Sequence, residues 1–137
     1  MQYQERMLKF LSRMEALSLR QAPLGRSDLT LAQFALLACI ARIPGSRAIE
    51  VAETMELTPP TVSVALRRLE DGNWLRRETD PEDKRSARLF VTEKAADILV
   101  EMKDHRNKKI AQFLNALSAE EQGQLISLLE KATEHLE

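Results

Sequence analysis

The sequence predicts a mostly helical α+β fold, in which a helix-turn-helix and a two-stranded hairpin lie between long terminal helices. Aromatic residues make up only 4% of the 137 residues, and Gly and Pro are few (4 and 5), which argues against a sandwich or barrel of short strands. Apolar residues recur at helical spacing over most of the chain, and the period changes only around residues 74–91. The length corresponds to about one domain with its own core.

Two helices are expected in the N-terminal third of the chain. The first covers residues 4–20, and a loop rich in Pro, Gly, Ser and Asp follows at 22–28. The second covers residues 31–42 with Asp28 or Thr30 as its N-cap, and it is apolar on most sides, which predicts a position near the centre of the fold. The apolar stripe of the first helix consists of Met7, Phe10, Leu11, Met14 and Leu17.

Two short helices, at residues 49–55 and 59–71, then form a helix-turn-helix pattern. Thr58 is a good N-cap for the second helix, and Pro59 stands at its first position, where a missing N–H costs nothing. At 100° per residue, one face of this second helix is apolar and must be buried. That face consists of Val62, Ala65, Leu66 and Leu69, while Pro60, Ser63, Val64 and Arg67 point outward, flanked by Thr61 and Arg68.

A hairpin is expected next, with strands at residues 74–79 and 87–91 and a polar turn between them. Its tip carries Asp83, Lys84 and Arg85. An exposed arginine on a rigid two-stranded arm suits insertion into a narrow minor groove of DNA, and Asp83 is expected to orient Arg85 by a charge-assisted hydrogen bond. The alternative is a charged loop that only blunts a sheet edge.

Two further helices complete the chain. One begins at Thr92 and Glu93 and ends near Asn115, and a capping box at Ser118 opens the other, which is expected to end near Leu136. Their apolar stripe consists of Phe113, Leu114, Leu117, Leu125, Leu128, Leu129 and Leu136. A winged domain of about 60 residues does not need the terminal helices in order to fold. Packing of both stripes against a second chain is therefore favoured over packing within one chain.

These elements divide the chain into three expected regions within one compact structure. Residues 1–20 form an N-terminal dimerisation helix, residues 29–96 a winged helix-turn-helix, and residues 97–137 the C-terminal dimerisation helices. The predicted interface residues are Met7, Phe10, Leu11, Met14, Leu17, Phe113, Leu117, Leu125, Leu128 and Leu129.

The residue inventory argues against enzymatic, metal-binding and membrane functions. A single cysteine excludes a disulfide framework and a multi-cysteine zinc site, and the two histidines lie far apart. The sequence shows no paired carboxylates and no nucleophile with a base nearby, so we expect neither an enzyme nor a cofactor. No apolar run approaches a membrane span, and the N-terminus lacks the order of a signal peptide, which predicts a cytoplasmic protein.

Double-stranded DNA is the expected partner, although the net charge is −1. The acidic excess of residues 91–137, with 6 basic and 9 acidic groups, would mask a local basic patch in the total. Small residues near the start of the 59–71 helix allow close approach to base edges, and an arginine one turn later can reach guanine or phosphate. The predicted DNA-binding residues are Thr58, Pro60, Thr61, Ser63, Val64, Arg67, Arg68, Asp83, Lys84 and Arg85.

The sequence resembles the MarR family of winged-helix transcription regulators, most densely between residues 48 and 96. The matching motifs are Thr58-Pro59-Pro60-Thr61-Val62-Ser63, Arg68-Leu69-Glu70, Leu75-Arg76-Arg77, Asp80-Pro81-Glu82-Asp83-Lys84-Arg85 and Val91-Thr92-Glu93-Lys94. The resemblance implies a homodimer, usually a repressor, whose helix at 58–71 enters the major groove while Arg85 enters the minor groove. It also implies release from DNA by a small apolar or phenolic effector, or by thiol oxidation.

The sequence departs from the family pattern at three positions. Val64 replaces a residue that is often basic, so a contact is lost or is replaced by contact with a thymine methyl group. Asn73 replaces a common Gly, and Asn is the next best residue for a left-handed helix end. Ala95 also replaces a common Gly, and this replacement costs little stability because alanine is favourable in a helix.

The sequence also bears on redox sensing, on a small-molecule ligand and on an alternative function. The single cysteine, Cys39, lies in an apolar helix rather than near the N-terminus, which disfavours redox sensing. A small ligand is expected in a cleft bounded by the second helix, the start of the fifth and the neighbouring N-terminal helix. The alternative function is a winged-helix module that docks proteins and binds no DNA.

Overall fold

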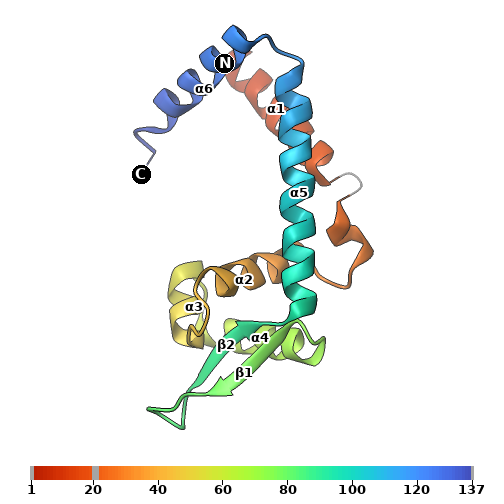
Figure 1. The fold of residues 1–137 in the computed structure, drawn as a ribbon. Helices are drawn as coiled ribbons and strands as arrows, with labels where there is room; N and C mark the ends of the chain where they lie inside the picture. Colours follow the sequence, from red (N-terminus) through yellow and green to blue (C-terminus); the bar gives the residue numbers. More distant parts are fainter. Residues whose placement is uncertain (1, 20–21, 137) are drawn as a thin grey trace. The chain divides into compact units, whose positions relative to one another are not determined.

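The computed structural model describes residues 2–19 and 22–136 (Figure 1). The chain divides into two compact units, Met1–Lys103 and Asp104–Glu137, with the boundary inside the fifth α-helix. The elements in chain order are α1 (Gln2–Leu19), the 3-10 helix η1 (Pro23–Arg26), α2 (Leu31–Arg42), α3 (Ala48–Met55), α4 (Pro59–Asp71), β1 (Leu75–Thr79), β2 (Ala87–Val91), α5 (Glu93–Asn115) and α6 (Ala119–Thr133). The expected mostly helical α+β fold with a single hairpin is confirmed. Arg20, the expected last residue of the first helix, lies outside the described residues.

Local capping interactions set the first residue of three helices. The Thr30 hydroxyl accepts a hydrogen bond from the Gln33 N–H (3.1 Å), and the Gln33 side chain accepts one from the Thr30 N–H (3.0 Å). This capping box makes Thr30, rather than Asp28, the N-cap of α2. Thr58 caps α4 and Ser118 caps α6, as the sequence predicts.

The core of the first unit lies where α2, α3, α4 and β2 meet. Leu37 and Ile40 of α2 are completely buried, which confirms the central position expected for this helix. Cys39 is buried beside them, in the environment of a core residue rather than of a reactive thiol. The largest of the other fully buried apolar side chains in this core are Val51, Val62, Leu66, Leu69 and Leu89.

The hairpin is joined to the helix-turn-helix by an interaction that periodicity does not reveal. β1 and β2 pair antiparallel, with Arg77 opposite Leu89. On its other edge, Leu89 donates its N–H to the Ser46 carbonyl and accepts a hydrogen bond from the Gly45 N–H, both at 2.9 Å. Gly45 has a φ of +82°, a left-handed conformation that glycine adopts without strain. The turn after α2 therefore extends the sheet by one bridge.

Trp74 does not start β1, as the sequence suggested, but belongs to the turn after α4. Its N–H donates to the Leu69 carbonyl (2.9 Å), and its ring is buried. Asn73 has a φ of +60°, which confirms that Asn serves as the left-handed residue here. A Cβ on Gly72 would lie 2.8 Å from Trp74 Cδ1, so glycine is required for the ring to pack this closely.

The terminal helices keep most of their apolar side chains exposed. In α1, Met7 is 51% exposed and Leu11 53%. None of the described residues of α6 is buried, and Leu128 is 65% exposed. The last helix ends at Thr133 rather than near Leu136. The Thr133 hydroxyl donates back to the carbonyls of Leu129 and Glu130 (2.9 and 3.0 Å), and such bonds compete with continuation of a helix.

Candidate nucleic-acid interface

The outward face of α4 carries the residues that the helical period predicts there. Val62, Leu66 and Leu69 are at most 1% exposed, whereas Val64 is 52% exposed. The remaining predicted contact residues of the helix-turn-helix are exposed as well: Thr58, Pro60, Thr61, Ser63, Arg67 and Arg68. The helix therefore presents small side chains near its start and two arginines one turn later.

The start of α4 is ordered by its own hydroxyl groups. Thr58 Oγ1 and Thr61 Oγ1 lie 2.7 Å apart, and the Thr61 N–H donates to Thr58 Oγ1 at 3.4 Å. Pro59 and Pro60 have no N–H to offer a phosphate. An anion at this end of the helix would thus bind mainly to threonine hydroxyls.

The tip of the hairpin depends on Asp80, a residue that was not among the predicted site residues. Its side chain is 0% exposed, and its Oδ2 lies 2.6 Å from Arg47 Nη2 and 3.6 Å from Arg88 Nε. The backbone N–H of Glu82, with Arg47 and Arg88, lowers the pKa of Asp80 to about 2. The sequence contains only a weak indication of this, an Asp-Pro pair at the end of a strand, which is typical of a turn.

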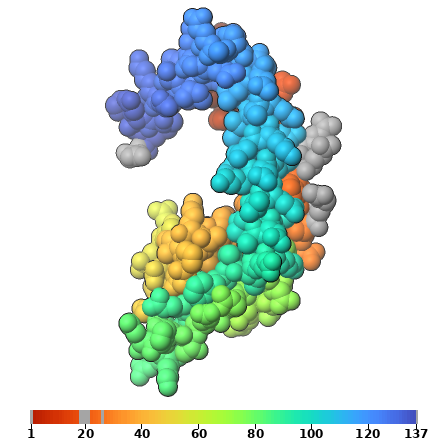
Figure 2. Space-filling model, viewed as in Figure 1, coloured from red at the N-terminus to blue at the C-terminus, as the bar shows by residue number. Residues whose placement is uncertain are grey.

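Asp83 does not orient the Arg85 guanidinium, contrary to expectation. Its Oδ1 accepts a hydrogen bond from the backbone N–H of Arg85 (3.0 Å), an Asx turn that shapes the tip instead. Within residues 22–136, neither Lys84 nor Arg85 forms an ion pair, and both are exposed. Figure 2 shows the hairpin, in green, projecting from the first unit.

A hollow of about 430 Å³ beside the hairpin collects positive charge. Its wall contains Arg47, Arg77, Lys84 and Arg85, and no acidic side chain. Arg77 is itself fixed by an ion pair with Glu70 of α4 (2.7 Å). Arg47 is likewise paired with Asp80, so Lys84 and Arg85 are the two cations of this hollow that favour an anionic occupant such as a phosphate of the DNA backbone.

The start of α5 holds the turn that follows α4. The Thr92 hydroxyl donates to the Asn73 carbonyl (2.7 Å), and Lys94 Nζ donates to the Gly72 carbonyl (3.0 Å). Lys94 Nζ also lies 3.9 Å from the centroid of the Trp74 ring, a cation–π contact. These contacts fix the orientation of α4 within the first unit.

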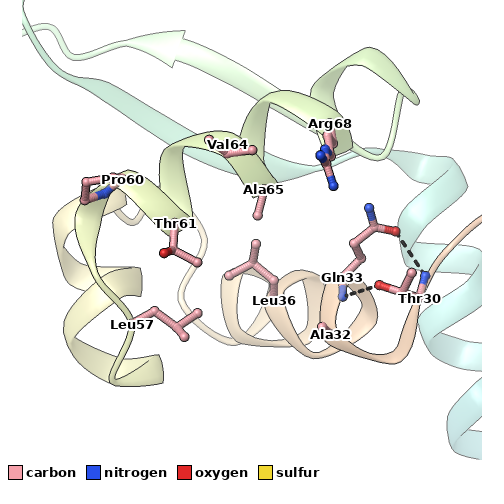
Figure 3. Close-up of a pocket in the computed structure, with 10 residues that line it drawn as sticks. All are labelled: Thr30, Ala32, Gln33, Leu36, Leu57, Pro60, Thr61, Val64, Ala65 and Arg68. Carbon is pink, nitrogen blue, oxygen red and sulfur yellow. Dashed lines mark hydrogen bonds between the residues drawn. The ribbon is translucent and has the colours of Figure 1, made fainter.

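A second hollow, of about 630 Å³, lies between α2 and α4 (Figure 3). Ala65 and Arg68 of α4 face Leu36 and Gln33 of α2 across it, and Val64 lies at its edge. Leu57, Pro60 and Thr61 line the end near the start of α4. This α2–α4 groove is mostly apolar with one cation, and it differs in position from the cleft expected beside the fifth helix.

The described residues hold no group of three or more His, Cys, Asp or Glu side chains that could bind a metal ion. Among the same residues, every helix is too short or too polar to cross a membrane.

Comparisons with known proteins agree with this geometry. The model of the MarR family matches residues 29–87. The YusO protein of Bacillus subtilis superposes with a TM-score of 0.85 at 24% identity, over 98% of this chain and 94% of that one. FabT of Streptococcus pneumoniae, solved in complex with DNA, gives 0.77 at 20% identity, over 98% and 99%. The transcriptional regulator Tm0710 of Thermotoga maritima gives 0.70 at 26% identity, over 97% and 93%. The winged-helix fold is thereby confirmed.

Proposed function

Because the chain belongs to the MarR family of transcriptional regulators through residues 29–87, we propose that it is a homodimeric repressor that binds a near-palindromic operator in the cytoplasm. The family consists of DNA-binding regulators and not of enzymes. The observation that carries the proposal is the combination of an exposed, small-residue face on α4 with exposed cations at the wing tip, which form no ion pair with any residue that the structure describes. The complex of FabT with DNA, a protein of the same fold, supports it.

Dimerisation is supported by the apolar side chains that the single chain leaves exposed. α1 exposes Met7 and Leu11, and α6 exposes Leu128 and Leu129. Helices with one unburied apolar face are stabilised by packing against another chain. A two-fold dimer would place the two α4 helices about 34 Å apart, one turn of DNA, and so requires an operator with two-fold symmetry.

Footprinting with transcription in vitro tests the proposed function. We expect protection of a near-palindromic site upstream of a regulated gene, and less transcript from that promoter when the protein is added. More transcript would contradict repression while preserving DNA binding. The absence of any footprint would favour the alternative, a module that docks proteins.

Val64 is expected to select a thymine in each half-site. It is exposed near the centre of the outward face of α4, and an apolar side chain there can contact the 5-methyl group of thymine. Replacing that thymine by deoxyuridine removes one methyl group and should weaken binding by about fourfold. The Val64→Ala variant should lose this sensitivity, whereas the neighbouring Ser63→Ala variant should keep it. A wild-type protein that tolerates deoxyuridine at every operator thymine would contradict the assignment.

The α2–α4 groove is the proposed site of a small aromatic or phenolic acid that acts as effector. Its apolar wall suits a ring, and Arg68 suits a carboxylate. Thr61, Val64 and Arg68 belong both to the groove and to the predicted DNA contacts. A ligand there therefore favours the DNA-free form, and by linkage it lowers the affinity for DNA.

Filling the groove separates effector binding from DNA binding. Ala32 lines the groove from α2 and lies outside the predicted DNA contacts, so Ala32→Trp should leave operator affinity within about twofold of wild type. Salicylate at millimolar concentration should release operator DNA from the wild type but not from this variant. Equal release from both proteins would place the effector elsewhere, and no release from either would contradict a phenolic effector.

A further inference from the structure

The carboxylate of Asp80 is buried at the point where β1 ends and the wing tip begins. Burying a carboxylate is costly unless its charge is compensated, and here two arginines compensate it. Arg47 donates through both Nε (3.1 Å) and Nη2 (2.6 Å) to the same oxygen, Oδ2. Arg88, on the facing strand, lies near that oxygen as an ion pair without a hydrogen bond.

The same carboxylate contacts residues at both ends of the tip loop. Oδ1 accepts the backbone N–H of Glu82 (3.0 Å), at the start of the tip. Oδ2 lies 3.4 Å from the Ser86 hydroxyl, at the end of the tip, and the Asp80 N–H donates to the Ser86 carbonyl (3.2 Å). The loop that carries Lys84 and Arg85 is therefore fixed at both ends by one residue.

Arg47 connects this arrangement to the helix-turn-helix. It is the N-cap residue of α3, and its own N–H donates to the Glu50 side chain (3.3 Å). The Arg47–Asp80 pair thus ties the root of the wing to a helix of the rigid core. This fixes the direction of the wing relative to α4 within the first unit.

We propose that Asp80 is a positioning residue for DNA binding, which holds the wing so that Arg85 reaches the minor groove while α4 occupies the major groove. Asp80 itself contacts no DNA, because it is buried. The inference rests on the proposed function and adds a residue that acts through Arg85. Two groove contacts made by one rigid body need a fixed relative geometry, and loss of that geometry weakens the wing contact.

The direction in which operator affinity changes when Asp80 is replaced distinguishes a positioning role from simple electrostatic repulsion. Removal of an acidic group near DNA reduces repulsion of the phosphates and, on that ground alone, would strengthen binding. Positioning predicts the opposite for Asp80→Asn, which keeps the size of the side chain but loses the charge that holds Arg47 and Arg88. Glu82→Gln is the matched control, because it removes an exposed acidic group from the same loop.

The experiment measures operator affinity for these variants in the wild-type and Arg85→Ala backgrounds, with melting temperatures in parallel. Asp80→Asn should weaken binding by about tenfold in the wild-type background and by less than about twofold when Arg85 is already absent. Glu82→Gln should bind as tightly as wild type or more tightly. Ser86→Ala, which removes one hydroxyl contact, should show a smaller loss with the same dependence on Arg85, and it decides the question if Asp80→Asn does not fold.

Two results would overturn the inference. If Asp80→Asn binds the operator as tightly as wild type, Asp80 does not position the wing. If its loss is as large in the Arg85→Ala background, Asp80 acts on stability or on other contacts. In either case wild-type operator binding would leave the proposed function intact, whereas a wild type without operator preference would remove both.

Discussion

Leu128→Asp is expected to convert the dimer into monomers and to reduce operator affinity by about 100-fold or more, because each half-site would then be bound by a separate molecule. Leu128 is 65% exposed in the single chain and lies on the apolar face of α6, where none of the described residues is buried. A carboxylate in an apolar interface is desolvated without a partner, a cost of several kcal/mol. The same change on an exposed monomer surface would cost little.

Sedimentation at several protein concentrations checks this expectation. Ser127→Asp is the matched control, since it adds the same charge on the more polar side of α6. It should leave the dimer intact. A double variant with Leu125→Asp and Leu128→Asp that remains a well-folded dimer would remove this helix from the interface, and with it the main argument for a two-fold operator.

Arg85→Ala is expected to weaken operator binding by roughly 1–3 kcal/mol, or about 5- to 150-fold, the usual contribution of one specific contact. The guanidinium is exposed and forms no ion pair among the described residues, so its removal breaks nothing within the chain. The melting temperature and the dimer should therefore be unchanged. The slope of log affinity against log salt should also fall by about 1.

Arg106→Ala provides the comparison for this variant. Arg106 is an exposed cation of the second unit, so its loss changes the net charge equally without touching the wing. If both variants bind alike, general charge explains the effect of Arg85, and its role in the minor groove is wrong.

The sequence predicted the elements whose limits depend on neighbouring residues. The limits of α4, residues 59–71, follow from Thr58 and Pro59 at one end and Gly72 at the other. Its buried and outward faces follow from the helical period alone. The second strand, residues 87–91, was predicted from a change in the period of apolar residues. The exposed cations of the tip were predicted from the run of polar residues before it.

What the sequence did not predict depends on residues distant along the chain. Asp80 and Arg47 are separated by 33 positions, and nothing in the local pattern shows that an acidic residue in a polar turn is buried. Asp83 was wrongly expected to hold the Arg85 guanidinium, because its carboxylate accepts the backbone N–H of Arg85 instead. The bridge between Ser46 and Leu89 was missed for the same reason.

The central claim is that this chain recognises a particular DNA sequence. Fluorescence anisotropy of the purified protein tests this claim most directly. The probe is labelled DNA from upstream of its own gene, compared with scrambled DNA of equal length and composition at 50 and 200 mM salt. We expect tighter binding to the upstream DNA at both salt concentrations, with affinity falling steeply as salt rises. Equal affinity for both probes, or no binding to either at 50 mM salt, would contradict the claim.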